Sequence, residues 1–301
     1  MKIAVLGAGA MGCLYAAMLS GRNAVTLYDA IPAVVDAVNG HGVICREADG
    51  TERTCRIPAR LAGDCDGGYD LVILFVKDLF SRSALETNRA VIGPDTLLLS
   101  LQNGMGNEEI MREFADPARI LLGTTKHNCV TLAPGEIYHS GAGMTHIGSP
   151  VGNRAAAEKV AALFRESGAD AEECDSVRHL LWEKLFVNMT INPLTALLDA
   201  PIGTLATDKE LQAYARALID EAVCVAAADG ERFDAETVFS QLIRTAAALS
   251  TGKASMCQDL EKKRRTEIDF INGAVVHLHH RSYYNEVQDG DIRHLHSLHL
   301  L

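Results

Sequence analysis

The chain has little aromatic or basic character. Its 301 residues are 5% aromatic and include a single tryptophan. Asp and Glu outnumber Lys and Arg by 39 to 28, which gives a formal net charge of −11. Nucleic acids and anionic membranes favour basic surfaces, so neither is an expected partner. The one short basic cluster, residues 262–265, is interpreted as a solvated helix face.

Metal-binding and membrane-spanning patterns are also missing. The eight cysteines occur singly, without a Cys-x-x-Cys pair, which predicts neither a zinc site nor a redox motif. Free thiols are typical of the reducing cytosol. No run approaches the ~20 apolar residues that cross a bilayer. The uncharged stretch after Lys2 resembles a secretory signal, but three glycines interrupt it. We therefore expect a cytoplasmic protein with no bound metal.

The most informative segment of the chain is IAVLGAGAMG, residues 3–12. A short apolar run meets three glycines, Gly7, Gly9 and Gly12, and a helix-compatible stretch follows. This order of strand, turn and helix is the context that the dinucleotide-binding fingerprint requires. Gly7 permits the tight turn, Gly9 lets the backbone approach a pyrophosphate, and Gly12 lets the helix pack closely on the strand.

An acidic residue supports this interpretation. Asp29 follows the fingerprint by about twenty residues, where a ligand for the ribose hydroxyls is expected. The amide-rich start of the helix would face the phosphates. The predicted cofactor-binding residues of this segment are Gly7, Ala8, Gly9, Ala10, Met11, Gly12 and Asp29.

The first half of the chain predicts an α/β fold. Continuous apolar runs at 69–76 and 96–101 are typical of strands that are buried on both faces of a parallel sheet. Further strands are expected at 24–28 and 120–124, and a helix from residue 32. Residues 135–139 and 144–147 are expected to form a hairpin. Strands that alternate with helical stretches predict a Rossmann-type doubly wound parallel sheet.

The second half predicts an all-helical domain. Segments rich in Ala, Leu, Glu and Arg carry apolar residues at helical spacing over 177–188, 209–228, 235–249 and 255–276. The domains are therefore expected to be 1–175, which binds the dinucleotide, and 176–301, which is helical and catalytic. Pro193 is expected to end or kink its helix near Asn192.

Polar residues stand where a dehydrogenase substrate would bind. Ligands bind beyond the carboxyl ends of the sheet strands, and Lys77 and Asn103 each follow an apolar run. Lys184, Asn188 and Asn192 are spaced i, i+4 and i+8, so an ammonium and two carboxamides share one helix face. Hydride addition to a ketone leaves negative charge on oxygen, which a nearby cation can stabilise and protonate.

These pieces together resemble the ketopantoate reductase family (2-dehydropantoate 2-reductases). They are GAGAMG at 7–12, Lys77, QNGMG at 102–106, THIG at 145–148, WEKLFVNMTINPLTAL at 182–197, SMCQD at 255–259 and RTEIDFING at 265–273. They are collinear and cover residues 1–276, nearly the whole chain.

The resemblance implies NAD(P)H-dependent reduction of a 2-oxo acid to a D-2-hydroxy acid, most simply 2-dehydropantoate in pantothenate biosynthesis. It implies that Lys184 is the general acid and that Glu267 binds the distal hydroxyl of the substrate. It also implies that Lys77 lies beside the cofactor and active site, and that the substrate and nicotinamide pocket is lined by Asn103, Asn188, Asn192 and Ser255.

The cofactor prediction comes from Asp29. A carboxylate there binds the ribose 2′-hydroxyl of NAD and repels the 2′-phosphate of NADP, and residues 30–38 contain no cation. NAD(H) is therefore preferred, with NADP(H) as the alternative known in the family. Family members with an acidic residue here suggest another branched or aromatic 2-oxo acid as the alternative substrate.

Other hypotheses have less support. The 3-hydroxyacid dehydrogenase group has a glycine-rich run before its lysine, whereas residues 174–183 contain no glycine. A non-enzymatic NAD(H)-binding regulatory protein would not need a proton donor such as Lys184. The family pattern ends after Val276, and the histidine-rich tail offers no arrangement that favours a metal. Structural roles are expected for His127, His139 and His146, and either a monomer or a homodimer is expected.

Overall fold

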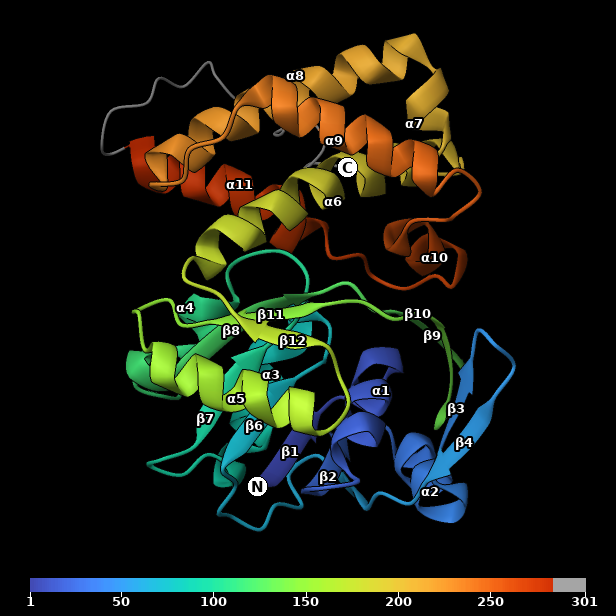
Figure 1. The fold of residues 1–301 in the computed structure, drawn as a ribbon, viewed down its shortest axis with the longest axis vertical. Helices are drawn as coiled ribbons and strands as arrows, with labels where there is room; N and C mark the ends of the chain where they lie inside the picture. The colour runs from blue at the N-terminus through green and yellow to red at the C-terminus, as the bar shows by residue number, and fades with distance from the viewer. Residues whose placement is uncertain (284–301) are drawn as a thin grey trace. The chain divides into compact units, whose positions relative to one another are not determined.

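The computed structural model describes residues 1–283, with side chains described to residue 280. It divides into two compact units (Figure 1). The first unit contains Met1–Gln102 and Asn107–Val177, and the second contains Asn103–Gly106 and the chain from Arg178 onward. The short segment Asn103–Gly106 thus belongs to the second unit, although the residues before and after it in the sequence belong to the first.

An eight-stranded sheet forms the centre of the first unit, in the order β12-β11-β8-β7-β6-β1-β2-β5. Its strands are β1 (Lys2–Leu6), β2 (Ala24–Asp29), β5 (Ala59–Leu61), β6 (Leu71–Leu74), β7 (Leu97–Ser100), β8 (Ile120–Thr125), β11 (Thr145–Gly148) and β12 (Ala171–Glu173). All neighbours are parallel except β8 and β11. β6 and β7 are buried along their whole length, as their apolar sequences predict. The expected α/β fold is confirmed.

Helices pack along this sheet. They are α1 (Ala10–Leu19), α2 (Pro32–His41), α3 (Ser81–Thr87), α4 (Asn107–Met111) and α5 (Arg154–Glu166), with short 3-10 helices at Asp78–Phe80, Arg89–Val91 and Pro117–Arg119. α5 packs on β11 and β12 at one end of the strand order, and α2 packs on β2 and β5 at the other (Figure 1). The Asn153 side chain caps α5 by accepting from the Ala156 amide.

A second sheet was not predicted. Its order is β4-β3-β10-β9, formed by β4 (Glu52–Cys55), β3 (Val43–Glu47), β10 (Glu136–Gly141) and β9 (Asn128–Ala133). Helix α1 packs against β3, β9 and β10. Its strands carry charged and exposed residues, so they lack the continuous apolar signal of the central sheet.

The expected hairpin between residues 135–139 and 144–147 is wrong. β10 pairs with β9 and β3, whereas β11 pairs with β8 and β12. The close fit of β11 to β8 depends on Gly123, because a Cβ there would lie 2.2 Å from the carbonyl oxygen of His146. The close fit of β11 between β8 and β12 therefore accounts for its pairing, and the glycine-rich turn before it does not.

The second unit is all-helical over its described residues, as predicted. Its helices are α6 (Val177–Leu198), α7 (Thr204–Thr207), α8 (Lys209–Ala228), α9 (Ala235–Ala248), α10 (Ser255–Glu261) and α11 (Ile268–Tyr283). Asp208 and Asp234 cap α8 and α9 through their side chains. The helix expected over 255–276 is instead two helices, and Lys263 between them has a φ of 52°.

Pro193 does not end α6, which continues to Leu198. A proline lacks the amide that would donate to the carbonyl four residues earlier, here that of Met189. The Nδ2 of buried Asn272 on α11 donates to this carbonyl over 2.9 Å. A side chain from a distant helix thus replaces the missing hydrogen bond, which the local sequence cannot indicate.

The described residues contain no membrane-spanning helix and include only part of the histidine-rich tail. No helix in residues 1–283 is long and apolar enough to span a membrane. His277, His279 and His280 lie on α11, whereas the remaining tail histidines at 294, 296 and 299 lie outside the described residues.

Candidate active site

The glycine-rich turn between β1 and α1 has the shape that an anion requires. Gly7 has a φ of 103°, and a Cβ there would lie 2.7 Å from the Val76 amide nitrogen. A Cβ at Gly12 would lie 1.8 Å from the carbonyl oxygen of Gly7, whereas one at Gly9 would meet nothing within 4 Å. Two glycines therefore permit close packing, and Gly9 faces open space that a ligand can occupy.

The start of α1 leaves its amides available. Gly9 caps the helix without a side-chain hydrogen bond, and the first turn has no acidic residue. Such a helix start attracts phosphate, because its free amides point along a favourable dipole. These residues fit the pyrophosphate of a dinucleotide.

Asp29 lies at the end of β2, beside this turn. Its Oδ2 accepts from the Ala8 amide over 2.8 Å, and its Oδ1 accepts from the Ile31 amide over 2.9 Å. These two bonds hold the carboxylate in place, and each oxygen keeps a second lone pair for a ligand. The position fits a ribose with free hydroxyls.

A buried polar network links the ends of β6 and β7. Asn107 donates to the Oδ1 of Asp78 over 2.5 Å, and Ser81 donates to the Oδ1 of Asn107 over 3.0 Å. The Nε2 of Gln102 donates to Ser81 over 2.8 Å and to the Val76 carbonyl over 2.7 Å. This network holds the backbone on either side of Lys77, which is half-buried. Sequence reasoning missed it, although polar residues just after apolar runs were a usable signal.

Asn103 opens a turn that packs on α11. Gly104 has a φ of 80°, and a Cβ there would lie 2.2 Å from the carbonyl oxygen of Phe270. The same carbonyl accepts from the Met105 amide over 2.9 Å. Glu267 lies three residues before Phe270, immediately before α11, and is half-buried. The structure therefore brings the segments of Asn103 and Glu267 together, although 163 residues lie between them in the sequence.

The predicted polar row lies on α6. Lys184 and Asn188 are half-buried, and Asn192 is buried. The Nδ2 of Asn192 donates to the Oγ of Ser255 at the start of α10 over 3.4 Å. Two of the predicted substrate-binding residues are thus in contact, from helices that are far apart in the chain.

Helix α6 is anchored at its first turn. Arg178 forms a two-pronged ion pair with Asp229 at the end of α8, over 2.7 and 2.8 Å. The indole nitrogen of buried Trp182 donates to the same carboxylate over 2.8 Å. These bonds fix the rotation of α6 and so the direction of its polar row.

A glycine-rich turn with an adjacent carboxylate, on a parallel sheet, is the arrangement of a dinucleotide-binding domain. The model of the family "Ketopantoate reductase PanE/ApbA" matches residues 3–152, and that of its C-terminal part matches residues 176–282. The chain belongs to the ketopantoate reductase family, and it is an NAD(P)-dependent oxidoreductase that reduces 2-oxo acids.

Known relatives match along most of their length. The 2-dehydropantoate 2-reductase of Halobacterium salinarum is 33% identical over 92% of this chain and 91% of its own. That of Streptococcus pyogenes serotype M1 is 32% identical over 91% and 90%. Among solved structures, D-mandelate dehydrogenase with NADH and anilino(oxo)acetate has a TM-score of 0.91 at 30% identity, covering 100% of this chain and 97% of its own. The 2-dehydropantoate 2-reductase of Geobacter metallireducens has a TM-score of 0.90 at 27% identity, covering 100% and 98%.

Proposed function

We propose that this chain reduces 2-dehydropantoate to (R)-pantoate, with Lys184 as the general acid. A bound reduced nicotinamide supplies the hydride to the ketone carbon. Lys184 stabilises the negative charge that develops on the ketone oxygen and donates a proton to it. The observation that carries this proposal is the polar row on α6, where an ammonium and two carboxamides share one face of the helix.

The neighbouring polar residues orient the substrate. Carboxamides and hydroxyls hold a carboxylate or a hydroxyl without titrating themselves, and this role is assigned to Asn103, Asn188, Asn192 and Ser255. The contact between Asn192 and Ser255 supports it. Glu267 accepts a hydrogen bond from the substrate hydroxyl, which selects substrates that carry one. The packing of the Asn103 turn on α11 supports a shared role for these two residues.

Asp29 favours NADH over NADPH. Its register partner in β5 is Leu61, and Ile31, two residues later, is 57% exposed; neither residue carries a positive charge. A 2′-phosphate would meet the Asp29 charge there. We expect a kcat/KM with NADH at least about tenfold higher than with NADPH. Steady-state kinetics with both cofactors test this, and a preference for NADPH would refute it.

A second substrate class is favoured by one comparison. D-mandelate dehydrogenase, which was solved with anilino(oxo)acetate, is similar to this chain along its whole length. An aromatic or branched 2-oxo acid without a distal hydroxyl is therefore the alternative substrate. Such a substrate would make no use of Glu267.

One assay separates the two candidates. NADH oxidation is followed with 2-dehydropantoate and with benzoylformate, for the wild type and for Glu267→Gln. If 2-dehydropantoate is the substrate, it gives the higher kcat/KM, and Glu267→Gln lowers that value by about tenfold or more. If benzoylformate reacts faster and the variant leaves its rate unchanged, the aromatic alternative replaces the proposal.

A further inference from the structure

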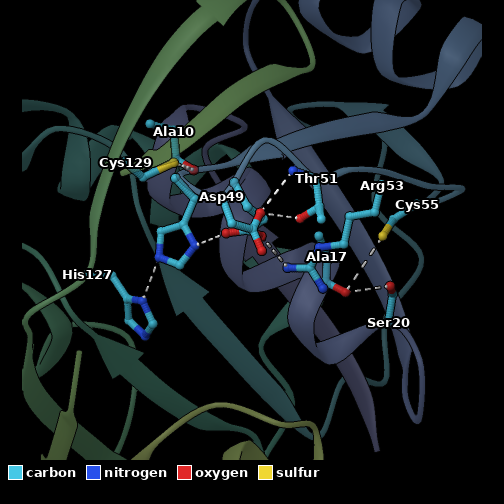
Figure 2. A network of polar contacts seen from close by, with 11 residues as sticks. Ala10, Ala17, Ser20, Asp49, Thr51, Arg53, Cys55, His127 and Cys129 are labelled. Atoms are coloured by element: carbon cyan, nitrogen blue, oxygen red, sulfur yellow. Dashed lines mark hydrogen bonds and ion pairs between the residues drawn. The ribbon is translucent and has the colours of Figure 1, made fainter. Parts of the chain in front are cut away.

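Three side chains of the first unit form a linear chain of hydrogen bonds. Glu47 on β3 contacts the Nδ1 of His139 on β10 over 2.6 Å, and the Nε2 of His139 contacts the Nδ1 of His127 over 3.0 Å. Figure 2 shows His127 at the end of this series of contacts, which starts beside Arg53 and passes near Cys129. The proposed catalytic roles use neither histidine.

The contacts fit an arrangement in which each ring carries a single proton. A carboxylate only accepts, so the Nδ1 of His139 donates to Glu47. In this arrangement the Nε2 of His139 accepts from the Nδ1 of His127. Burial, and secondarily the neighbouring His139, lower the pKa of His127 below its usual value, which favours its neutral form. The remaining nitrogen of His127, its Nε2, therefore carries a lone pair.

This lone pair has no donor among the described residues. His127 is 8% exposed, and its Nε2 is buried without a hydrogen-bond partner. The ring of Tyr15 contacts His127 at its edge, but the Tyr15 hydroxyl is used by Thr125 and Thr145. A buried acceptor without a donor is costly, so its retention calls for a donor from outside the described residues.

The position of His127 narrows the choice of donor. It lies two residues beyond β8, at the carboxyl end of the parallel strands, where ligands bind in this fold. In the strand order, β2 lies on one side of β1, and β6, β7 and β8 lie on the other. A dinucleotide whose adenosine ribose meets Asp29 on β2 and whose pyrophosphate meets the glycine turn directs its nicotinamide half toward β6, β7 and β8.

We propose that the Nε2 of His127 accepts a hydrogen bond from the carboxamide N–H of the nicotinamide ring. Glu47 and His139 hold His127 in the required tautomer and act as positioning residues. The inference rests on the proposed use of a nicotinamide cofactor. Because the Nε2 is buried, the proposal requires the side chains that cover it to move when the cofactor binds.

Two conservative variants separate this role from a structural one. In His127→Asn the side-chain amide overlays the Nδ1 and still donates to His139, but the Nε2 acceptor is gone. In His127→Gln the side-chain amide overlays the Nε2, so its oxygen can accept, but the link to His139 is lost. A purely structural role predicts that Asn substitutes well and Gln poorly, whereas the carboxamide contact predicts the reverse.

The probe is a cofactor analogue that lacks the donor. Reduced 3-acetylpyridine adenine dinucleotide carries a methyl group in place of the carboxamide NH2. We expect the wild type to bind NADH about tenfold more tightly than this analogue, as measured by fluorescence titration. The ratio of the analogue Kd to the NADH Kd falls to about one in His127→Asn and is largely kept in His127→Gln. An unchanged ratio in His127→Asn overturns the proposal.

ADP-ribose, which lacks the nicotinamide, separates a failure of the His127 contact from a failure of dinucleotide binding. Equal affinity of ADP-ribose for the wild type and both variants shows that the glycine turn and Asp29 are intact. If ADP-ribose binds but His127→Asn keeps the full discrimination, the role of His127 fails alone. If neither NADH nor ADP-ribose binds the wild type, the proposed function fails with it.

Discussion

The two units carry their candidate functional residues in different ways. In the first unit, a single short segment, residues 7–12, forms the candidate phosphate site through the shape of its backbone. In the second unit, the candidate residues are side chains that come from the turn at 103–106, from α6, from the start of α10 and from the residue before α11. Backbone shape follows from local spacing, whereas a set of side chains depends on how distant segments pack.

The largest expected effect is in the second unit, on helix α6. Lys184→Ala removes the proposed proton donor and should lower kcat by about 10²–10⁴-fold, with little change in the melting temperature. Lys209→Ala, at the exposed start of α8, is the matched control and should keep full activity. A Lys184→Ala enzyme with kcat close to the wild-type value would contradict the assignment.

The glycine turn should respond differently at its separate positions. Gly12→Ala places a Cβ 1.8 Å from a carbonyl oxygen, so it should lower the free energy of unfolding by at least about 2 kcal/mol. Gly9→Ala adds a methyl group in open space, so unfolding should change by less than about 0.5 kcal/mol. It should nevertheless weaken ADP-ribose binding by about tenfold or more, because the methyl group occupies the phosphate site.

Urea unfolding and ADP-ribose titration of both glycine variants check this contrast. Equal stability losses at Gly9 and Gly12 would show that both glycines serve packing alone.

The continuity of α6 depends on a contact between distant helices. Asn272→Leu leaves the Met189 carbonyl without a donor and should lower the free energy of unfolding by about 1–2 kcal/mol. Pro193→Ala restores a backbone amide that can donate to the same carbonyl. In the Pro193→Ala background the cost of Asn272→Leu should therefore be smaller by about 1 kcal/mol. If the two mutations have additive effects in this double-mutant cycle, the Asn272 side chain does not replace the missing backbone amide of residue 193 as the donor to the Met189 carbonyl.

The smallest effect concerns the pH dependence of stability in the first unit. The pKa of His127 is lowered in the folded chain by burial and by His139, so the unfolded chain takes up this proton first as the pH falls. The stabilisation is complete above the ordinary histidine pKa, about 6.5, and is lost below it. Between pH 7.5 and 5.5 the wild type should lose more stability than His127→Asn, by less than about 1.4 kcal/mol per pH unit. Parallel pH profiles of the two proteins would contradict the lowered pKa.

The central sheet and the second sheet show which strands a local sequence pattern predicts and which it misses. β6 and β7 were predicted because Leu, Val and Ile run without interruption through strands that are buried on both faces. β3 and β4 were missed because residues such as Arg46 and Glu52 face solvent and form an ion pair there. β3 is a strand because it pairs in parallel with β10, about ninety residues later, which no local pattern encodes.

The candidate site also has one part that local spacing predicts and another part that only tertiary packing creates. The spacing of Lys184, Asn188 and Asn192 was sufficient to place them on one helix, because i, i+4 spacing depends only on helix geometry. Of the two outcomes expected at Pro193, an end or a kink of the helix, the end does not occur, because Asn272 supplies the missing hydrogen bond. The Nε2 of His127, unpaired among the described residues, was equally invisible, since the contacts that run from Glu47 through His139 to the Nδ1 of His127 join three separate segments of the fold.

The sequence by itself determined the elements whose rules are local. These are the glycine turn with its helix start, the buried parallel strands and the polar row on α6, each set by the spacing of a few neighbouring residues. Only the tertiary structure decided the contact of Asn192 with Ser255, the packing of the Asn103 turn on α11 and the tautomer of His127. The physical reason is that contacts between distant residues arise from the packing of whole elements, and burial then selects which polar groups must find one another.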